Sequence, residues 1–146
     1  MRVVADAAVL AKTLVPEAES DKARELLDEW MSGRLSLLAP GILPAEVASV
    51  LWRRVCCNLL TIDEATQLYT DFARLGIPLV PIEELIPEAL EFALCYKQSV
   101  YDCLHLALAH ETGSILVTAD ARMVEAMRAA PVEVRLLGKW PTWRIG

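Results

Sequence analysis

Residues 114–120 read Ser-Ile-Leu-Val-Thr-Ala-Asp, and this stretch decides the fold. The apolar run from Ile115 to Val117 predicts a strand that is covered on both faces, as in a parallel sheet between helices. Asp120 follows within two residues of the strand, where the next helix is expected to begin. The same succession of strand, acidic residue and helix recurs along the chain, which favours an α/β fold.

Strands and helices alternate throughout the sequence. Besides residues 114–118, the expected strands are 2–5, 35–39, 77–82 and 132–137. The third of these is expected to be short or at an edge, because Pro78 and Pro81 lack a backbone donor. Helical periodicity or caps predict helices over 23–31, 44–55, 61–75, 88–97, 100–112 and 120–130. We therefore expect a single domain over residues 1–146, a three-layer fold whose four- or five-stranded, mostly parallel sheet has helices on both faces.

Composition limits the class of protein. The net charge of −6, from 14 basic and 20 acidic residues, has the wrong sign for a protein that coats nucleic acid, but it does not exclude a nuclease whose carboxylates bind metal. A hydrophobic fraction of 55% and a mean hydropathy of +0.36 are high for a soluble monomer, so we expect a homodimer. The sequence has no apolar run near the ~18 residues of a membrane span and no leader pattern, which predicts a cytoplasmic protein with no membrane partner.

The chain has four cysteines, Cys56, Cys57, Cys95 and Cys103. They do not have the spacing of zinc ligands, and free cysteines behave as small apolar residues, so we expect buried thiols. His105 and His110 lie on an otherwise apolar helix and are expected to pack in the core rather than to act in acid–base catalysis.

Four carboxylates from distant parts of the sequence are expected to meet at one edge of the sheet: Asp6, Glu46, Asp102 and Asp120. The carboxyl ends of parallel strands gather ligand-binding groups there. Two carboxylates about 4 Å apart repel by about 4 kcal/mol at an effective dielectric near 20, so a cluster needs protons or a cation. We therefore predict a divalent metal site. Each acid taken alone is also explained as a helix cap or a first-turn charge.

Two hydroxyl residues stand close to these acids in the sequence. Ser99 and Thr118 would hold a ligand carboxylate or a water molecule in place, unless they serve only as a cap and a strand residue. Three tryptophans, Trp52, Trp140 and Trp143, are candidates for an interface or for ordinary packing.

Four stretches of the sequence, in this order, resemble one known family. They read VVADAAVLAKTLVPE (3–17), APGILPAEVASVLWRR (39–54), SVYDCLHLALAHETG (99–113) and ILVTADARM (115–123). They are similar to the PIN-domain ribonucleases, in particular the VapC-like toxins of prokaryotic toxin–antitoxin pairs, and the resemblance runs from about residue 2 to residue 137. The sequence departs from many relatives at Ala8, Ser49 and His105, where Ser, Asn and Tyr are usual. These changes bear on substrate details, because each leaves the carboxylates intact.

The resemblance implies a function and a set of partners. The acids matching Asp6, Glu46, Asp102 and Asp120 would bind Mg²⁺ or Mn²⁺ and hydrolyse single-stranded RNA, and a small antitoxin protein would bind the enzyme. Basic residues near the acidic motifs would guide the RNA phosphates, unless they are solvated helix charges; these are Lys12, Arg53, Arg54 and Arg122.

Two other interpretations of the sequence remain open. One is a PIN-like interaction module that holds a structural ion without catalysis. The other is an unrelated α/β phosphotransfer or phosphatase domain with Asp6 as the nucleophile. The second interpretation lacks support from the sequence, because Ala8 stands where a phosphatase needs another Asp.

Overall fold

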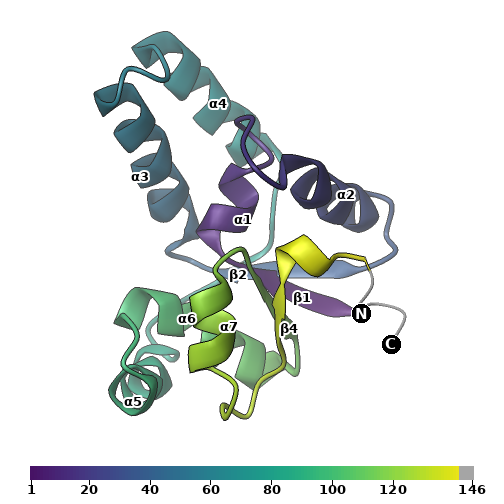
Figure 1. Ribbon diagram of the computed structural model, residues 1–146, viewed down its shortest axis with the longest axis vertical. Coiled ribbons are helices and arrows are strands. Elements are labelled where there is room, and N and C mark those ends of the chain that lie inside the picture. The colour runs from purple at the N-terminus through teal and green to yellow at the C-terminus, as the bar shows by residue number, and fades with distance from the viewer. Residues whose placement is uncertain (142–146) are drawn as a thin grey trace.

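A computed structural model describes residues 1–141 of the chain. It contains one five-stranded sheet with the strand order β3-β2-β1-β4-β5, and all neighbouring strands are parallel (Figure 1). The strands are β1 (Arg2–Ala5), β2 (Ser36–Pro40), β3 (Leu79–Val80), β4 (Ile115–Thr118) and β5 (Val134–Leu136). Val4 of β1 lies in register between Leu38 and Leu116, so β1 is the central strand. The predicted parallel α/β sheet is confirmed.

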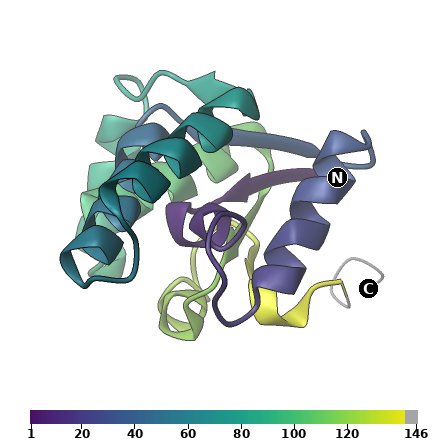
Figure 2. The same ribbon diagram turned by 90° about the horizontal axis from the view of Figure 1, so that it is seen from above.

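Helices cover both faces of the sheet (Figures 1 and 2). Helices α1 (Ala7–Ala11), α2 (Ser20–Met31), α3 (Leu43–Cys56) and α4 (Ile62–Arg74) lie on one side. Helices α5 (Ile86–Tyr96), α6 (Val100–Thr112) and α7 (Ala121–Ala126) lie on the other side, and a short 3₁₀ helix, η1 (Leu137–Lys139), follows β5.

The period-two alternation of strand β1 divides the core into two halves. Val3 and Ala5 pack into the cluster beneath α1 to α4, whereas Val4 packs against α5, α6 and α7. All three side chains are fully buried, which is the pattern expected of a strand covered on both faces.

Three elements differ from the sequence prediction. Helix α1 was not predicted, since five residues give too little periodicity to recognise. Helix α7 ends at Ala126 rather than at residue 130, because residues 127–130 form tighter turns, in which the Arg128 amide donates to Glu125 O and the Ala130 amide donates to Met127 O. Strand β3 is reduced to two residues between the two prolines that flank it. The other boundaries shift by at most three residues, the largest shift being the start of α2 at Ser20, and the predicted capping box of Thr61 and Glu64 is present at the start of α4.

The prediction of buried thiols is wrong for three of the four cysteines. Cys56 and Cys57 are exposed because they lie at the end of α3, beyond its packed stripe, and Cys95 is exposed on α5. Cys103 is buried in α6. Burial, with a smaller contribution from the Asp102 charge, raises the pKa of its thiol to about 11.

Aromatic and histidine side chains also divide between core and surface. Trp140 is buried in the core, whereas Trp52 is 64% exposed, and Trp143 lies outside the described residues. His105 is buried as predicted, but His110 is not: its side chain is 40% exposed and its Nδ1 lies 2.8 Å from Glu88 Oε1. In the described part of the chain, no helix has the length and apolar character needed to cross a bilayer.

Candidate active site

Asp6 stands at the junction of β1 and α1. Its Oδ1 accepts a hydrogen bond of 2.9 Å from the Val9 amide, which makes Asp6 the N-cap of α1. The Thr118 hydroxyl, buried at the end of neighbouring strand β4, also hydrogen-bonds to the Asp6 carboxylate. Two neighbouring strands thus fix the position of this acid at the carboxyl edge of the sheet.

The Asp6 carboxylate is costly to ionise. Burial raises its pKa above the ordinary value of 3.8, and the nearby Asp102 charge raises it further. The hydrogen bonds from Val9 and Thr118 and the proximity of His105 lower the pKa but do not offset burial. The site therefore contains a desolvated acid that a cation would stabilise in its ionised form.

Glu46 lies in the first turn of α3 and contacts a histidine from α6. Its Oε1 is 2.7 Å from Nε2 of His105, whose side chain is only 1% exposed. Because a carboxylate can only accept, Nε2 is the nitrogen that donates to Glu46. The other ring nitrogen, Nδ1, is buried without a hydrogen-bond partner. His105 therefore has one polar contact in the described structure, and that contact orients Glu46.

Asp102 enters the site from the first turn of α6. Ser99 caps this helix, and its Oγ accepts the Asp102 amide at 3.1 Å. Ser99 thus has the capping role that the sequence left open, and it fixes the Asp102 backbone rather than a carboxylate. Asp102 itself is exposed.

A cavity of about 440 Å³ brings three of the four predicted acids together. Asp6, Glu46 and Asp102 line it, along with the side chains Ala7, Ala8, Ile42, Ala45, Ser49, Val50, Arg53 and Tyr101. Asp120 does not line this cavity; it caps α7, and its Oδ1 accepts the Arg122 amide at 2.9 Å. Thr118 connects it to the site, because the Thr118 hydroxyl accepts the Asp120 amide at 3.1 Å and also bonds Asp6.

The chemistry of these donors fits a hard divalent cation. Three carboxylates from three elements share one cavity, and oxygen ligands of this kind suit Mg²⁺ or Mn²⁺. Within residues 1–141, however, no three Asp, Glu, His or Cys side chains are drawn together into a metal-binding group.

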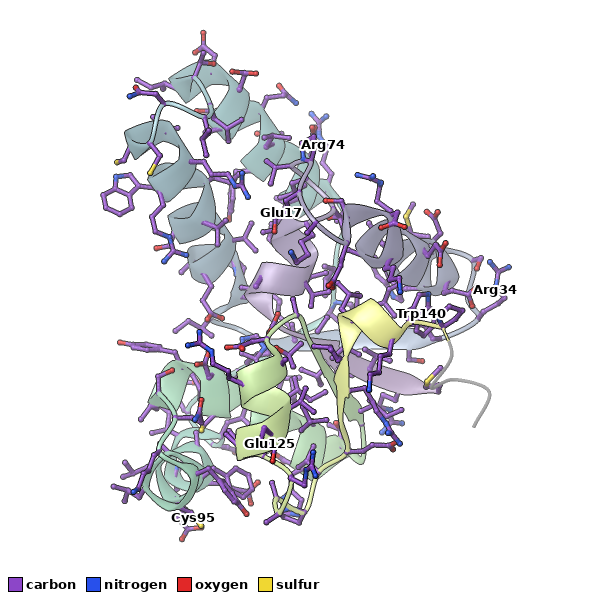
Figure 3. The ribbon with its side chains drawn as sticks, viewed as in Figure 1. Glu17, Arg34, Arg74, Cys95, Glu125 and Trp140 are labelled. Carbon is purple, nitrogen blue, oxygen red and sulfur yellow. The ribbon has the colours of Figure 1, made fainter. Side chains whose placement is uncertain are left out.

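The basic residues near the acids have different surroundings. Lys12 and Arg54 both pair with Glu17 in the loop after α1, with 2.7 Å between Lys12 Nζ and Glu17 Oε1. Figure 3 shows Glu17 on the side of the sheet that carries α1 and α3. Arg122 is 95% exposed and lies 3.6 Å from Asp120. Of the four predicted basic residues, only Arg53 lines the cavity, and it forms no ion pair within the described residues.

No site role for Tyr101 is predicted from the sequence, and His105 is predicted to be a core residue. The helical spacing does indicate that Arg53 lies near the site, because Glu46, Ser49 and Arg53 fall on one face of α3. A similar spacing places Asp102 and His105 on neighbouring turns of α6. What the spacing does not give is the partner of His105, which lies 59 residues away in the sequence.

Comparison with known proteins agrees with this architecture. The PIN domain model matches residues 3–128. Ribonuclease VapC3 of Pyrobaculum aerophilum is 29% identical over 131 residues, which cover 88% of this chain and 97% of VapC3.

Two solved structures share the fold at lower identity. Mycobacterium tuberculosis VapC20, described as a Sarcin-Ricin loop cleaving toxin, superposes with a TM-score of 0.67 at 17% identity, over 91% of this chain and 98% of that chain. A chain of a toxin–antitoxin complex from Klebsiella pneumoniae superposes with a TM-score of 0.62 at 15% identity. The superposition covers 92% of this chain and 97% of that chain. Since the family model spans most of the sequence and the fold agrees, this chain belongs to the PIN domain family.

Proposed function

We propose that this chain is a metal-dependent endoribonuclease that hydrolyses phosphodiester bonds of single-stranded RNA, and that it is the toxin of a toxin–antitoxin pair. The observation that carries the proposal is the convergence of Asp6, Glu46 and Asp102 on one cavity. The likeness to ribonuclease VapC3 along nearly its whole length supports the same reaction class.

Asp6, Glu46 and Asp102 would hold Mg²⁺ or Mn²⁺, and Asp120 would add a ligand or orient a water molecule. The ion, when bound, supplies activation of water and neutralisation of charge on the phosphodiester. The protein contributes orientation: Thr118 and the Val9 amide fix Asp6, and His105 fixes Glu46.

The test is an RNA cleavage assay with the purified protein. Wild type is incubated with a mixed-sequence single-stranded RNA and Mn²⁺ or Mg²⁺, and chelator or Asp102→Asn is expected to abolish cleavage. Asp63→Asn is the matched control, because Asp63 also lies in the first turn of a helix, α4, but does not line the cavity. Cleavage that survives both chelator and Asp102→Asn would contradict the proposal.

A parallel measurement separates the enzyme from the interaction module. Mn²⁺ binding is followed by calorimetry for wild type and Asp102→Asn. Metal binding that depends on Asp102 without cleavage of any RNA would favour the module over the nuclease.

The proposed antitoxin partner has a candidate docking surface between α3 and α4. An apolar groove of about 280 Å³ is lined there by Ala48, Leu51, Trp52, Val55, Ile62, Ala65, Thr66 and Tyr69. Trp52 and Ile62 are 64% and 74% exposed, which is unusual for large apolar side chains without a partner. We propose that an apolar segment of the antitoxin binds this groove, because large exposed apolar side chains line it; a toxin–antitoxin complex contains a chain of this fold.

Coexpression tests this assignment. A small DNA-binding protein encoded directly beside this gene is expected to copurify with the wild-type chain and to inhibit its cleavage activity. Trp52→Arg is expected to weaken the complex while leaving cleavage intact. If Trp52→Arg changes the oligomeric state of the chain alone, the groove belongs to a second copy instead.

A further inference from the structure

Two side chains of the cavity have no part in holding a metal ion. Arg53 enters from the last turn of α3, and Tyr101 enters from the first turn of α6, next to Asp102. Both are exposed, and Tyr101 is 62% exposed. A large aromatic ring that is exposed to solvent at the edge of a charged site is suited to bind a ligand with a flat apolar face.

Arg53 is the cation best placed to meet a phosphate at this site. The cavity carries three carboxylates, so an RNA strand that enters it meets negative charge beyond what one divalent ion neutralises. Lys12 and Arg54, the two other basic candidates that lie on this side near the acidic motifs, are paired with Glu17. Arg53 is free of ion pairs in residues 1–141, and its planar group binds phosphate through two parallel hydrogen bonds.

Tyr101 supplies what the carboxylates lack, namely a surface for a base. Bases of single-stranded nucleic acid stack on exposed aromatic rings, and the backbone follows a nearby positive charge. The apolar part of the cavity wall, formed by Ile42, Ala45 and Val50, gives further surface for a flat ring. A volume of about 440 Å³ falls within the range of ordinary small-molecule sites.

We propose that Tyr101 and Arg53 form a nucleotide subsite, in which Tyr101 stacks on an unpaired base and Arg53 binds a phosphate adjacent to the bond that is cut. The proposal rests on the proposed ribonuclease function for its substrate class. It gives the single-strand requirement of that function a physical cause at one nucleotide: the base beside the cleaved bond has to be unpaired, because a base within a duplex cannot expose its face to Tyr101.

The first experiment follows base stacking directly. A single-stranded oligoribonucleotide carries 2-aminopurine at each position in turn and is titrated with the wild-type protein in Ca²⁺, under conditions first checked for absence of cleavage. Fluorescence quenching is expected at one position only. Tyr101→Phe and Tyr101→Trp retain the quenching, whereas Tyr101→Leu loses it and lowers affinity about ten-fold. Circular dichroism of each variant verifies the fold, which an exposed side chain is not expected to affect.

The second experiment isolates the phosphate contact. The affinity for the same RNA is measured over a range of salt concentrations for wild type, Arg53→Gln and Arg74→Gln. Loss of one phosphate contact from a single strand lowers the slope of log K against log salt by about 0.7. Arg53→Gln is expected to show this decrease. Arg74→Gln is the matched control, since Arg74 is also an exposed arginine at the end of its helix but lies on α4 outside the cavity (Figure 3).

The outcomes separate the subsite from the ribonuclease function. The subsite would be overturned, and the nuclease retained, if the wild-type protein cleaves RNA while Tyr101→Leu and Arg53→Gln both keep the affinity and the quenching of wild type. Quenching that depends on Tyr101 in a protein that cleaves no RNA with any divalent metal would retain the subsite and overturn the nuclease. A wild-type protein that does not bind single-stranded RNA would overturn both.

Discussion

The desolvated, half-buried Asp6 carboxylate is expected to lower the stability of the metal-free protein when it is ionised. Its pKa is raised on folding, so the folded state binds this proton more tightly than the unfolded state does. The contribution of Asp6 to stability is therefore intact below pH 3.8 and is lost as the pH rises through the higher pKa of the folded state. The full penalty applies above the folded-state pKa, and a bound cation would relieve it.

The first prediction concerns this penalty. Asp6→Asn is expected to raise the Tm of the chelated protein at pH 7, because the amide is neutral and still caps α1. The difference in Tm from wild type is expected to shrink as the pH falls toward 3.8. Differential scanning calorimetry from pH 4 to pH 8 measures both effects, with Asp63→Asn as a control for an exposed acid. A lower Tm for Asp6→Asn at pH 7 would show that ionised Asp6 stabilises the fold.

A second prediction concerns the hydrogen bond between His105 and Glu46. His105→Leu removes the donor that orients Glu46, and loss of such a contact commonly costs ten-fold or more in metal affinity. His105→Gln is expected to recover most of the affinity because its side-chain amide also donates. Mn²⁺ titration by calorimetry measures the affinity of each variant.

His110→Leu is the matched control for His105. It removes a histidine that also contacts a glutamate, Glu88, on the exposed side of α6. Equal Mn²⁺ affinities for His105→Leu and wild type would show that the orientation of Glu46 does not matter for metal binding.

The individual acids could be predicted from sequence because strand ends and helix starts are local features. Asp6 and Asp102 are recognisable from the few residues around them. The pairing of Lys12 and Arg54 with Glu17 could not be predicted, because it depends on how the loop after α1 folds back onto α3. For the same reason, the sequence did not single out Arg53 as the basic residue left for a substrate.

Helix α6 positions Asp102 through its cap, which leads to a third prediction. Ser99→Ala removes an N-cap hydrogen bond and is expected to cost about 1 kcal/mol, or about 4 °C in Tm for a chain of this size. Ser99→Asn is expected to restore the Tm, because Asn is an equally good cap. Thermal denaturation measures both variants.

The same variants decide whether Ser99 also acts on the metal site. Because its hydroxyl bonds the Asp102 backbone, Mn²⁺ affinity of Ser99→Ala is expected to stay within about two-fold of wild type. A ten-fold loss would show that Ser99 orients a ligand, as the sequence analysis allowed.

Long elements could be predicted and short ones could not. The six expected helices and the buried strand β4 are periodic or apolar over enough residues to stand out. Helix α1 is missed because its five residues continue the apolar pattern of β1, and only its cap, Asp6, marks the boundary. The end of α7 could not be predicted, because the apolar residues Met127, Ala129 and Ala130 continue beyond Ala126 as far as Pro131.

A fourth prediction concerns dimerisation of the whole molecule through the outer surface of α5. Ile86, Leu90 and Leu94 recur every four residues and are 42%, 48% and 74% exposed, so they form one apolar stripe. Together with the high mean hydropathy of the chain, this stripe supports the predicted homodimer. In a twofold dimer, the stripe would pack against its own copy.

Light scattering after size-exclusion chromatography tests this dimer. Wild type is expected to elute with twice the mass of the chain, and Leu94→Lys is expected to shift it toward the monomer. Met31→Lys, at a residue that is 65% exposed at the end of α2, is the control that should not change the mass. A wild-type monomer at high micromolar concentration would rule out dimerisation through α5.

The central position of β1 has a consequence for synthesis of the protein. Asp6 is translated well before Thr118, yet the hydroxyl that holds it belongs to Thr118, and its strand is completed on one side by β4. A growing polypeptide that ends before Thr118 has no such support, and one that ends before Asp102 lacks a carboxylate of the cavity. We therefore expect the acids to assemble around the cavity only after Thr118 has been translated, so the site forms late in synthesis.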